Sequence, residues 1–217
     1  LLDPQATKCA NCGQPQILRG RYRIKRLLGQ GGFGVVYEAY DIDLQRHYAI
    51  KLINVMSPAM REQVTVEAQI LAQHARRFPF IPEIYDIWTE ANYLILVMEY
   101  VEGQTLQHWL DQRETLTVPA MAALGAAMAR AAHSLHQQNV CHLDLKPANV
   151  LIRPDGAAVM LDFGLSCHAQ YPDLLAEELR KAVGSPVWIS PEQVVGVRGD
   201  PRSDIFAIGV MLYELAT

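Results

Sequence analysis

The sequence predicts an α+β fold of two lobes: a small antiparallel sheet with one helix, then a mainly helical lobe that is incomplete. Three observations predict this fold. Short β-branched and aromatic segments between Tyr22 and Met98 are typical of strands. One amphipathic helical pattern interrupts them. After Gly103 the strand-like pattern ends, and Ala-rich segments that predict helices follow.

The strands and the first helix are predicted in chain order. Four segments predict strands, and the last is apolar enough to be buried on both faces: 22–28, 35–40, 47–53 and 93–98. Ser57 followed by Pro58 predicts the start of a helix, with Ser57 as N-cap. Its buried face recurs at helical spacing through Val64, Ala68 and Leu71. Pro79 ends it.

Two further helices are predicted in the second lobe. Residues 116–136 are rich in Ala and Met without alternation, which predicts a buried helix. Residues 205–215 predict a last helix capped by Ser203. The expected organisation is a tail over residues 1–20, a small lobe over 21–98, and a hinge with the large lobe over 99–217.

The composition is that of a packed globular chain with balanced charge. Half of the 217 residues are hydrophobic and 19% are charged, and 19 Lys and Arg stand against 23 Asp and Glu. The formal charge of −4 gives no electrostatic reason to expect nucleic acid as a partner. The longest apolar run, 118–129, is shorter than the roughly 20 residues that a membrane-spanning helix needs. Four cysteines and no secretory pattern lead us to expect a cytoplasmic protein.

A glycine-rich segment lies between the first two predicted strands. It runs Gly29-Gln30-Gly31-Gly32-Phe33-Gly34 and fits the pattern G-x-G-x-x-G, in which backbone N–H groups can approach phosphate oxygens. An ordinary glycine-rich hairpin turn is the plain alternative. In dinucleotide-binding proteins, this glycine pattern is followed directly by a helix. Here a β-branched strand follows instead, which argues against a dinucleotide-binding motif.

A lysine that could bind phosphate, and two candidate carboxylate partners for it, follow this turn. Lys51 lies in the third predicted strand, where it is either a solvated edge charge or a ligand of phosphates. Glu67 on the following helix is the best candidate for its carboxylate partner, and Glu62 is the weaker one.

An acid, a lysine and an amide then occur within six residues, in His142-Leu143-Asp144-Leu145-Lys146-Pro147-Ala148-Asn149. The tripeptide Asp162-Phe163-Gly164 follows, 18 residues after Asp144. Alone, each piece is a common turn or cap. Together, behind a glycine-rich turn and a strand lysine, they resemble the eukaryotic-type Ser/Thr protein kinase family. The sequences of these motifs resemble those of bacterial members of the family.

The resemblance runs from about Arg21 to the end, and it implies roles for the matching residues. Lys51 would contact the α- and β-phosphates of ATP and pair with Glu67. Asn149 and Asp162 would bind Mg²⁺. Asp144 would orient the substrate hydroxyl and Lys146 would neutralise the transferred group. The implied nucleotide contacts are Leu28, Gly29, Gln30, Gly31, Gly32, Phe33, Gly34, Val36, Ala49, Lys51, Glu67, Met98, Glu99, Val101 and Leu151.

The resemblance also implies a substrate class. Lys146, two residues after Asp144, is typical of kinases that act on Ser and Thr, and so is the segment 184–192. Ser185 would contact Asp144 and Lys146. The implied function is Mg²⁺-assisted phosphorylation of Ser and Thr hydroxyls of protein substrates by ATP. The alternative is a kinase-fold scaffold, or pseudokinase, that acts by binding partners.

Two departures from the family pattern carry expectations. Leu143 replaces the arginine that receives an activation-loop phosphate, so we expect activity without that phosphate. The segment 166–183 has only Ser166 and Tyr171 as hydroxyl acceptors. The chain also stops inside its last helix, before the arginine that would pair with Glu192, so we expect a fragment that is poorly stable or inactive alone.

The tail contains a single C-x₂-C knuckle, Cys9 and Cys12. A structural Zn²⁺ site requires four ligands, so a zinc ribbon would need a second pair from elsewhere, and a metal-free tail is the alternative. A third interpretation treats the knuckle as an interaction module whose partner determines the kinase function. Cys141 and Cys167 are expected to be ordinary small residues.

Overall fold

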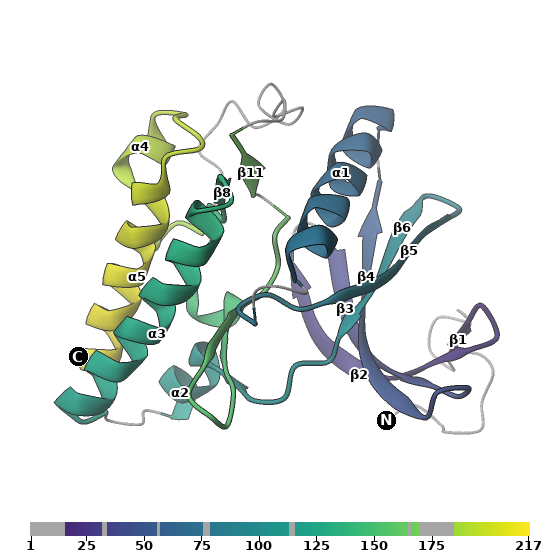
Figure 1. Cartoon of the computed structure of the whole chain (residues 1–217), viewed down its shortest axis with the longest axis horizontal. Helices are drawn as coiled ribbons and strands as arrows, with labels where there is room; N and C mark the ends of the chain where they lie inside the picture. Colours follow the sequence, from purple (N-terminus) through teal and green to yellow (C-terminus); the bar gives the residue numbers. More distant parts are fainter. Residues whose placement is uncertain are drawn as a thin grey trace. The chain divides into compact units, whose positions relative to one another are not determined.

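The computed structural model describes residues 16–31, 34–55, 57–75, 79–112, 116–164, 166–169 and 185–217 (Figure 1). The chain divides into two compact units. The first contains the described residues up to Arg61 together with Glu83–Tyr100, and the second contains Glu62–Pro82 and Val101–Thr217. The α+β class predicted from the sequence is confirmed.

The first unit is a six-stranded sheet in the order β1-β2-β3-β4-β6-β5, with every neighbouring pair antiparallel. Its strands are β1 (Ile17–Leu18), β2 (Tyr22–Gly31), β3 (Gly34–Asp41), β4 (Arg46–Asn54), β5 (Ile84–Glu90) and β6 (Tyr93–Glu99). The four predicted strands are therefore present. β1 and β5 were not predicted, because β1 has two residues and β5 carries Asp86 and Glu90 among its apolar residues.

One face of this sheet holds an aromatic and aliphatic core. Its members are Tyr22, Ala39, Tyr48, Ile50, Trp88, Ile95 and Val97. The rings of Tyr22 and Trp88 stack, with centroids 6.1 Å apart and an interplanar angle of 18°. Full burial of a large apolar side chain stabilises the fold by about 1.5–3 kcal/mol, so this cluster dominates the stability of the sheet.

Helix α1 (Pro58–Ala75) begins where the sequence predicted. The Ser57 hydroxyl accepts the backbone N–H of Met60 at 3.1 Å, as an N-cap does. Val64 and Ala68 are buried, as their spacing predicted, while the side chain of Leu71 lies outside the described part. The division between the two units falls within this helix.

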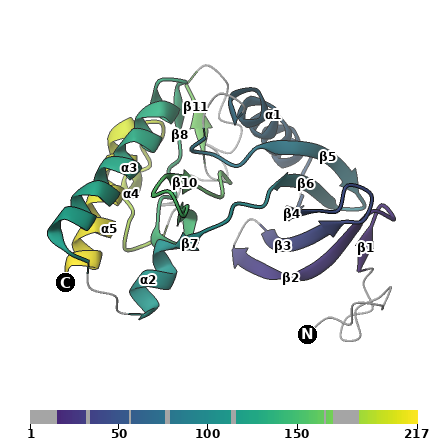
Figure 2. The same cartoon turned by 60° about the horizontal axis from the view of Figure 1, so that its bottom comes forward.

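The second unit is mainly helical (Figure 2). Its helices are α2 (Leu106–Gln112), α3 (Val118–His136), α4 (Pro191–Val194) and α5 (Pro201–Ala216), with a 3₁₀ turn η1 (Pro147–Asn149). α3 and α5 lie side by side in both views. The short strands are β7 (Gln104–Thr105), β8 (Val140–Cys141), β9 (Val150–Ile152), β10 (Ala158–Met160) and β11 (Cys167–His168). They form two small antiparallel sheets, β10-β9-β7 and β11-β8.

The two long helices differ from expectation in detail. α3 is buried on one face only, through Leu124, Ala127, Met128, Ala131, Ala132 and Leu135. Its first residue, Val118, is 81% exposed. α5 is capped by Asp200 and not by Ser203, because Pro201 takes the first helical position and Asp200 accepts the N–H of Arg202. No helix in the described part of the chain is long and apolar enough to cross a membrane.

Candidate active site

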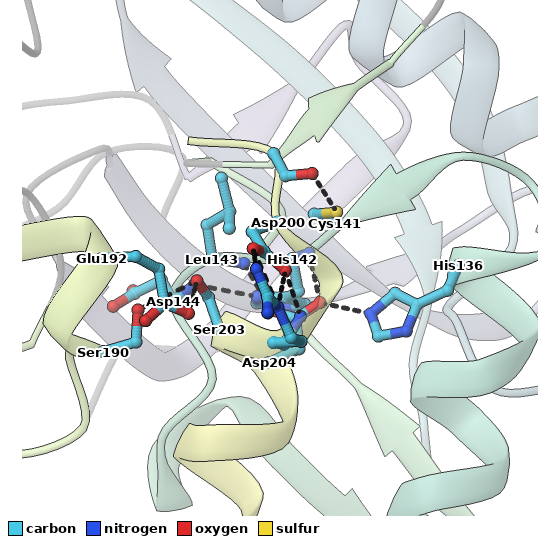
Figure 3. A network of polar contacts seen from close by, with 12 residues as sticks. His136, Cys141, His142, Leu143, Asp144, Ser190, Glu192, Asp200, Ser203 and Asp204 are labelled. Carbon is cyan, nitrogen blue, oxygen red and sulfur yellow. Dashed lines mark hydrogen bonds and ion pairs between the residues drawn. The ribbon is translucent and has the colours of Figure 1, made fainter. Parts of the chain in front are cut away.

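The centre of the site is the segment 142–146, which joins β8 to η1. Asp204, in the first turn of α5, is only 1% exposed. It accepts the backbone N–H of His142 at 2.9 Å and that of Leu143 at 2.8 Å (Figure 3). The positive end of the α5 dipole favours a carboxylate at this position. The loop is thus anchored to a helix about 60 residues further along the chain.

Two histidines border this anchor. His136, in the last turn of α3, places Nε2 2.8 Å from Oδ2 of Asp204. His142 is fully buried, and its Nε2 donates to the carbonyl of Leu161 at 2.8 Å. Its ring packs against Phe163 with centroids 4.6 Å apart. His142 therefore supports the loop by packing, while the role of His136 was missed.

Three donors converge on the carboxylate of Asp144, whose side chain is 10% exposed. Lys146 Nζ donates to Oδ2 at 2.8 Å and Ser185 Oγ donates to Oδ1 at 3.0 Å. Asn149 Nδ2 lies 3.3 Å from Oδ2 and also donates to the backbone carbonyl of Asp144 at 2.8 Å. The structure thus brings four predicted residues together, including Ser185 from a segment 41 residues away.

Asp162 is linked to this group through the backbone of the residue that precedes it. Its φ is +60°, and its Oδ1 accepts the N–H of Gly164 at 3.4 Å. The preceding residue, Leu161, donates its N–H to the carbonyl of Asn149 at 2.8 Å. Asn149 and Asp162 are therefore on segments that are bonded to each other. An amide oxygen and a carboxylate are hard oxygen ligands, which fit Mg²⁺, an ion that usually completes its shell with water and phosphate.

The glycine-rich turn belongs to the first unit. Gly31 and Gly34 pair across the β2–β3 hairpin, and Gly32 and Phe33 lie outside the described residues. Gly34 has φ +146°, and a Cβ atom there would lie 2.2 Å from the carbonyl oxygen of Leu52. The close passage of β4 therefore requires glycine at position 34, independently of any phosphate.

The strands align the predicted nucleotide residues of the first unit in rows. Gly29, Val36, Lys51 and Leu96 are successive partners across β2, β3, β4 and β6, and Ala49 is opposite Met98. Residues opposite each other, or two apart on one strand, share a face. Val36, Ala49, Lys51 and Met98 thus share one face, and Lys51 is 6% exposed. The side chain of Glu67 lies outside the described part, so its pairing with Lys51 stays a prediction.

The remaining predicted nucleotide residues have varied surroundings. Val101 and Leu151 form an apolar cluster with Val159 and Leu161 in the second unit. In the first unit, Leu28 is 39% exposed, Gln30 is exposed on β2, and the N–H of Glu99 donates to the carbonyl of Glu83 at 2.8 Å.

The segment after Ser185 adds residues that sequence reasoning missed. Ser190 and Gln193 form a capping box at the start of α4, and the side chain of Gln193 also donates to the carbonyl of Leu143 at 2.8 Å. The S-x-x-Q spacing was the available signal. Glu192 accepts the hydroxyl of Ser203 at 2.7 Å, and this hydrogen bond lowers the pKa of the Glu192 carboxyl.

The cysteines fall into two groups. Cys9 and Cys12 lie outside the described residues, so the zinc knuckle stays a prediction. Within the described part of the chain, no group of three or more His, Cys, Asp and Glu residues is arranged to bind a metal ion. Cys141 and Cys167 are buried free thiols, directly opposite each other in the β8–β11 pair, and they pack with Leu143.

Comparison with known proteins agrees with this geometry. The chain is 33% identical over 204 residues to a probable serine/threonine-protein kinase of Clostridium acetobutylicum, which covers 93% of the chain and 30% of that relative. It is 35% identical over 208 residues to the serine/threonine-protein kinase PrkC of Bacillus subtilis, covering 92% of the chain and 31% of the relative. Against the serine/threonine-protein kinase PknL of Mycobacterium tuberculosis, identity is 30% over 204 residues, which is 93% of the chain and 50% of the relative.

These relatives are bacterial, as the motif sequences predicted. The chain spans only 30–50% of their length. A family model described as the protein kinase domain matches residues 22–217. With nearly the whole chain matched, this protein belongs to the protein kinase domain family.

Proposed function

We propose that the protein transfers the γ-phosphoryl group of ATP to Ser and Thr hydroxyls of protein substrates. The observation that carries this proposal is the convergence of Lys146, Asn149 and Ser185 on the carboxylate of Asp144. An acceptor for a hydroxyl proton thus lies beside a cation that can neutralise a phosphoryl group. Phosphoryl transfer depends mainly on such positioning and electrostatic stabilisation.

Each residue has a distinct task in this proposal. Asp144 accepts the hydrogen bond of the substrate hydroxyl and orients its oxygen toward the γ-phosphate. Lys146 offsets the charge on the transferred group. The hydroxyl of Ser185 donates to Oδ1 of Asp144 and so orients the carboxylate. Asn149 and Asp162 would bind Mg²⁺, which supplies neutralisation of the phosphate charge when it is bound.

The nucleotide is assigned to the residues that the resemblance to kinases implies. Lys51 would contact the α- and β-phosphates, and its burial on β4 favours a strong charge-assisted hydrogen bond with them. Val36, Ala49 and Met98 share the face of Lys51 and provide apolar surface for adenine. Val101 and Leu151 provide a second apolar set for the base.

The test is phosphotransfer by the full-length protein, measured with labelled ATP and a Ser/Thr peptide library. Asp144→Ala should lower kcat by at least about 100-fold, since removal of a proton acceptor costs about 10²–10⁴. Asp111→Ala is the matched control, because Asp111 is exposed on α2 and contacts only Gln107 of the same helix within the described residues. A wild-type protein that binds ATP and Mg²⁺ but transfers no phosphate would contradict the proposal and favour the scaffold.

A further inference from the structure

We propose that Gln193 is a positioning residue for phosphoryl transfer, which fixes the peptide group that leads into Asp144. This inference rests on the proposed function, because it assigns a task relative to the reacting carboxylate. Gln193 lies in α4 and touches neither the nucleotide residues nor Asp144 directly in the described contacts. Its effect is transmitted through the backbone of Leu143.

Both polar atoms of the Gln193 side-chain amide form hydrogen bonds. Nε2 donates to the carbonyl oxygen of Leu143 at 2.8 Å, and Oε1 accepts the backbone N–H of Ser190 at 3.1 Å. The residue is buried, with an exposed fraction of only 6%. A donor at one end and an acceptor at the other define the orientation of the amide. The capping box alone would require only the acceptor.

Leu143 has a backbone conformation that requires support. Its φ is +64°, in the left-handed region that a branched side chain rarely adopts. Its N–H belongs to the peptide group before it and donates to Asp204 at 2.8 Å. Its carbonyl belongs to the peptide group after it and accepts from Gln193. Because each peptide group is planar, these two bonds together define the dihedral angles of Leu143.

The second of these peptide groups ends in the nitrogen of Asp144. Its orientation therefore sets the direction in which the Asp144 side chain leaves the backbone. The segment that carries Gln193 also reaches the carboxylate itself, through the 3.0 Å bond from Ser185. Leu143, Asp144, Ser185 and Gln193 line one small pocket. The segment 185–193 thus positions Asp144 at two points, its backbone and its carboxylate.

The substitution Gln193→Glu separates the two functions of the amide. A carboxylate still accepts the N–H of Ser190 but cannot donate to the carbonyl of Leu143. We expect kcat to fall at least about tenfold at pH 8, equivalent to about 1.4 kcal/mol. The KM for ATP should change less than about twofold, because the lost bond does not reach the nucleotide residues.

Protonation of the introduced carboxylate in Gln193→Glu should restore the donor. Burial raises the pKa of such a carboxyl, and the negative charges of Asp144 and Asp204 in the same pocket and of the adjacent Glu192 raise it further, while Lys146 acts in the opposite direction. The ratio of variant to wild-type kcat should therefore rise as the pH falls from about 8 to about 6. A merely structural defect would not recover in this way.

Two further variants complete the experiment in the full-length protein. Gln193→Met keeps the volume and removes both polar ends, so its kcat should be low at every pH. Gln107→Glu is the matched control, because Gln107 is only partly buried on α2 and its amide donates to Asp111 of the same helix, and it should show neither loss nor pH recovery. Melting temperatures and ATP affinity confirm that each variant is folded at the assay temperature.

Full kcat in Gln193→Met, or a loss in Gln193→Glu that does not change with pH, would overturn the inference. An inactive wild type would instead refute the proposed function itself, so the two failures are distinguishable.

Discussion

The carboxylate of Asp204 accepts the backbone N–H of Leu143 at 2.8 Å, and Leu143 is the residue directly before Asp144. The same carboxylate accepts the N–H of His142 and contacts Nε2 of His136. Among the described contacts, α5 contributes no group to the Asp144 carboxylate. It nevertheless fixes the backbone that directly precedes Asp144. The position of the Asp144 carboxylate therefore depends on buried hydrogen bonds that do not touch it.

Asp204→Asn should weaken both stability and activity. One carboxylate oxygen would become an NH₂ group facing N–H donors, so at least one buried donor would lose its acceptor. Such a loss costs about 1–3 kcal/mol, and we expect the free energy of unfolding in urea to fall by at least this amount. Asp200→Asn, at the same helix start, is the control, because Asn also caps helices. Equal unfolding free energies for wild type and Asp204→Asn would contradict this prediction.

The structure supports the prediction that activity does not require an activation-loop phosphate. Leu143 is buried against Cys141 and Cys167, so the position usually occupied by a phosphate-binding arginine is apolar. Ser166 is 3% exposed and donates its hydroxyl to the carbonyl of Phe163 at 2.8 Å. Tyr171 lies outside the described residues. Phosphatase treatment should leave the rate of peptide phosphorylation unchanged, and a large decrease would contradict the prediction.

Local patterns predicted most of the fold. The Ser57–Pro58 start of α1 and four strands followed from capping and alternation, which depend on neighbouring residues. The cap of α5 was misassigned, because Ser203 and Asp200 are both good capping residues and only the position of Pro201 separates them. Gln193 and His136 were missed as site residues, since their bonds reach Leu143 and Asp204 from distant segments. The group of residues around Asp144 was predictable because its spacing is characteristic of the family.

A polar cluster in the first unit should affect the affinity for ATP. Glu38 accepts Arg26 Nε at 2.6 Å and contacts His47 Nδ1 at 2.7 Å, and Arg26 Nη2 donates to the hydroxyl of Tyr100 at 3.0 Å. Tyr100 directly precedes Val101, which we propose contacts the nucleotide. Glu38→Gln should therefore raise the KM for ATP by about two- to fivefold, with a small change in stability because Arg26 is 60% exposed.

Tyr100→Phe separates this effect from general loosening of the sheet. It removes the last bond of the cluster and leaves the Glu38 contacts intact, so a smaller rise in KM is expected. A fall in melting temperature without any change in KM would contradict a role in nucleotide affinity.

Stability should depend on acid pH through Asp41. Its side chain is fully buried and accepts Arg21 Nε at 2.8 Å and the N–H groups of Asp43 and Leu44. The hydrogen bond from Arg21 is the main cause that lowers the pKa of the Asp41 carboxyl. Because the folded-state pKa lies below the unfolded value of about 3.9, the stabilisation is present above that pH and is lost as the pH falls through the folded pKa.

Asp41→Asn tests this dependence by thermal unfolding between about pH 7 and about pH 3. The wild type should melt higher at neutral pH, and the difference should shrink below about pH 4. Asp43→Asn is the control, since the Asp43 side chain is 68% exposed and lies 3.7 Å from Arg21. A difference between wild type and Asp41→Asn that stays constant down to the acid end of this range would contradict the assignment.

The thiol of Cys141 should be unreactive in the folded protein. Hydrogen bonding with Cys167 and burial raise the pKa of the Cys141 thiol well above its usual range, and its Sγ also donates to the carbonyl of Gly199 at 3.4 Å. Alkylation requires the thiolate, whose fraction falls about tenfold for each unit by which the pKa rises. Iodoacetamide should therefore modify Cys141 at least about 100-fold more slowly in the native than in the denatured protein, as measured by peptide mass mapping. Modification at the rate of a free thiol would show that β8 and β11 separate in solution and leave the loop at Leu143 without its apolar support.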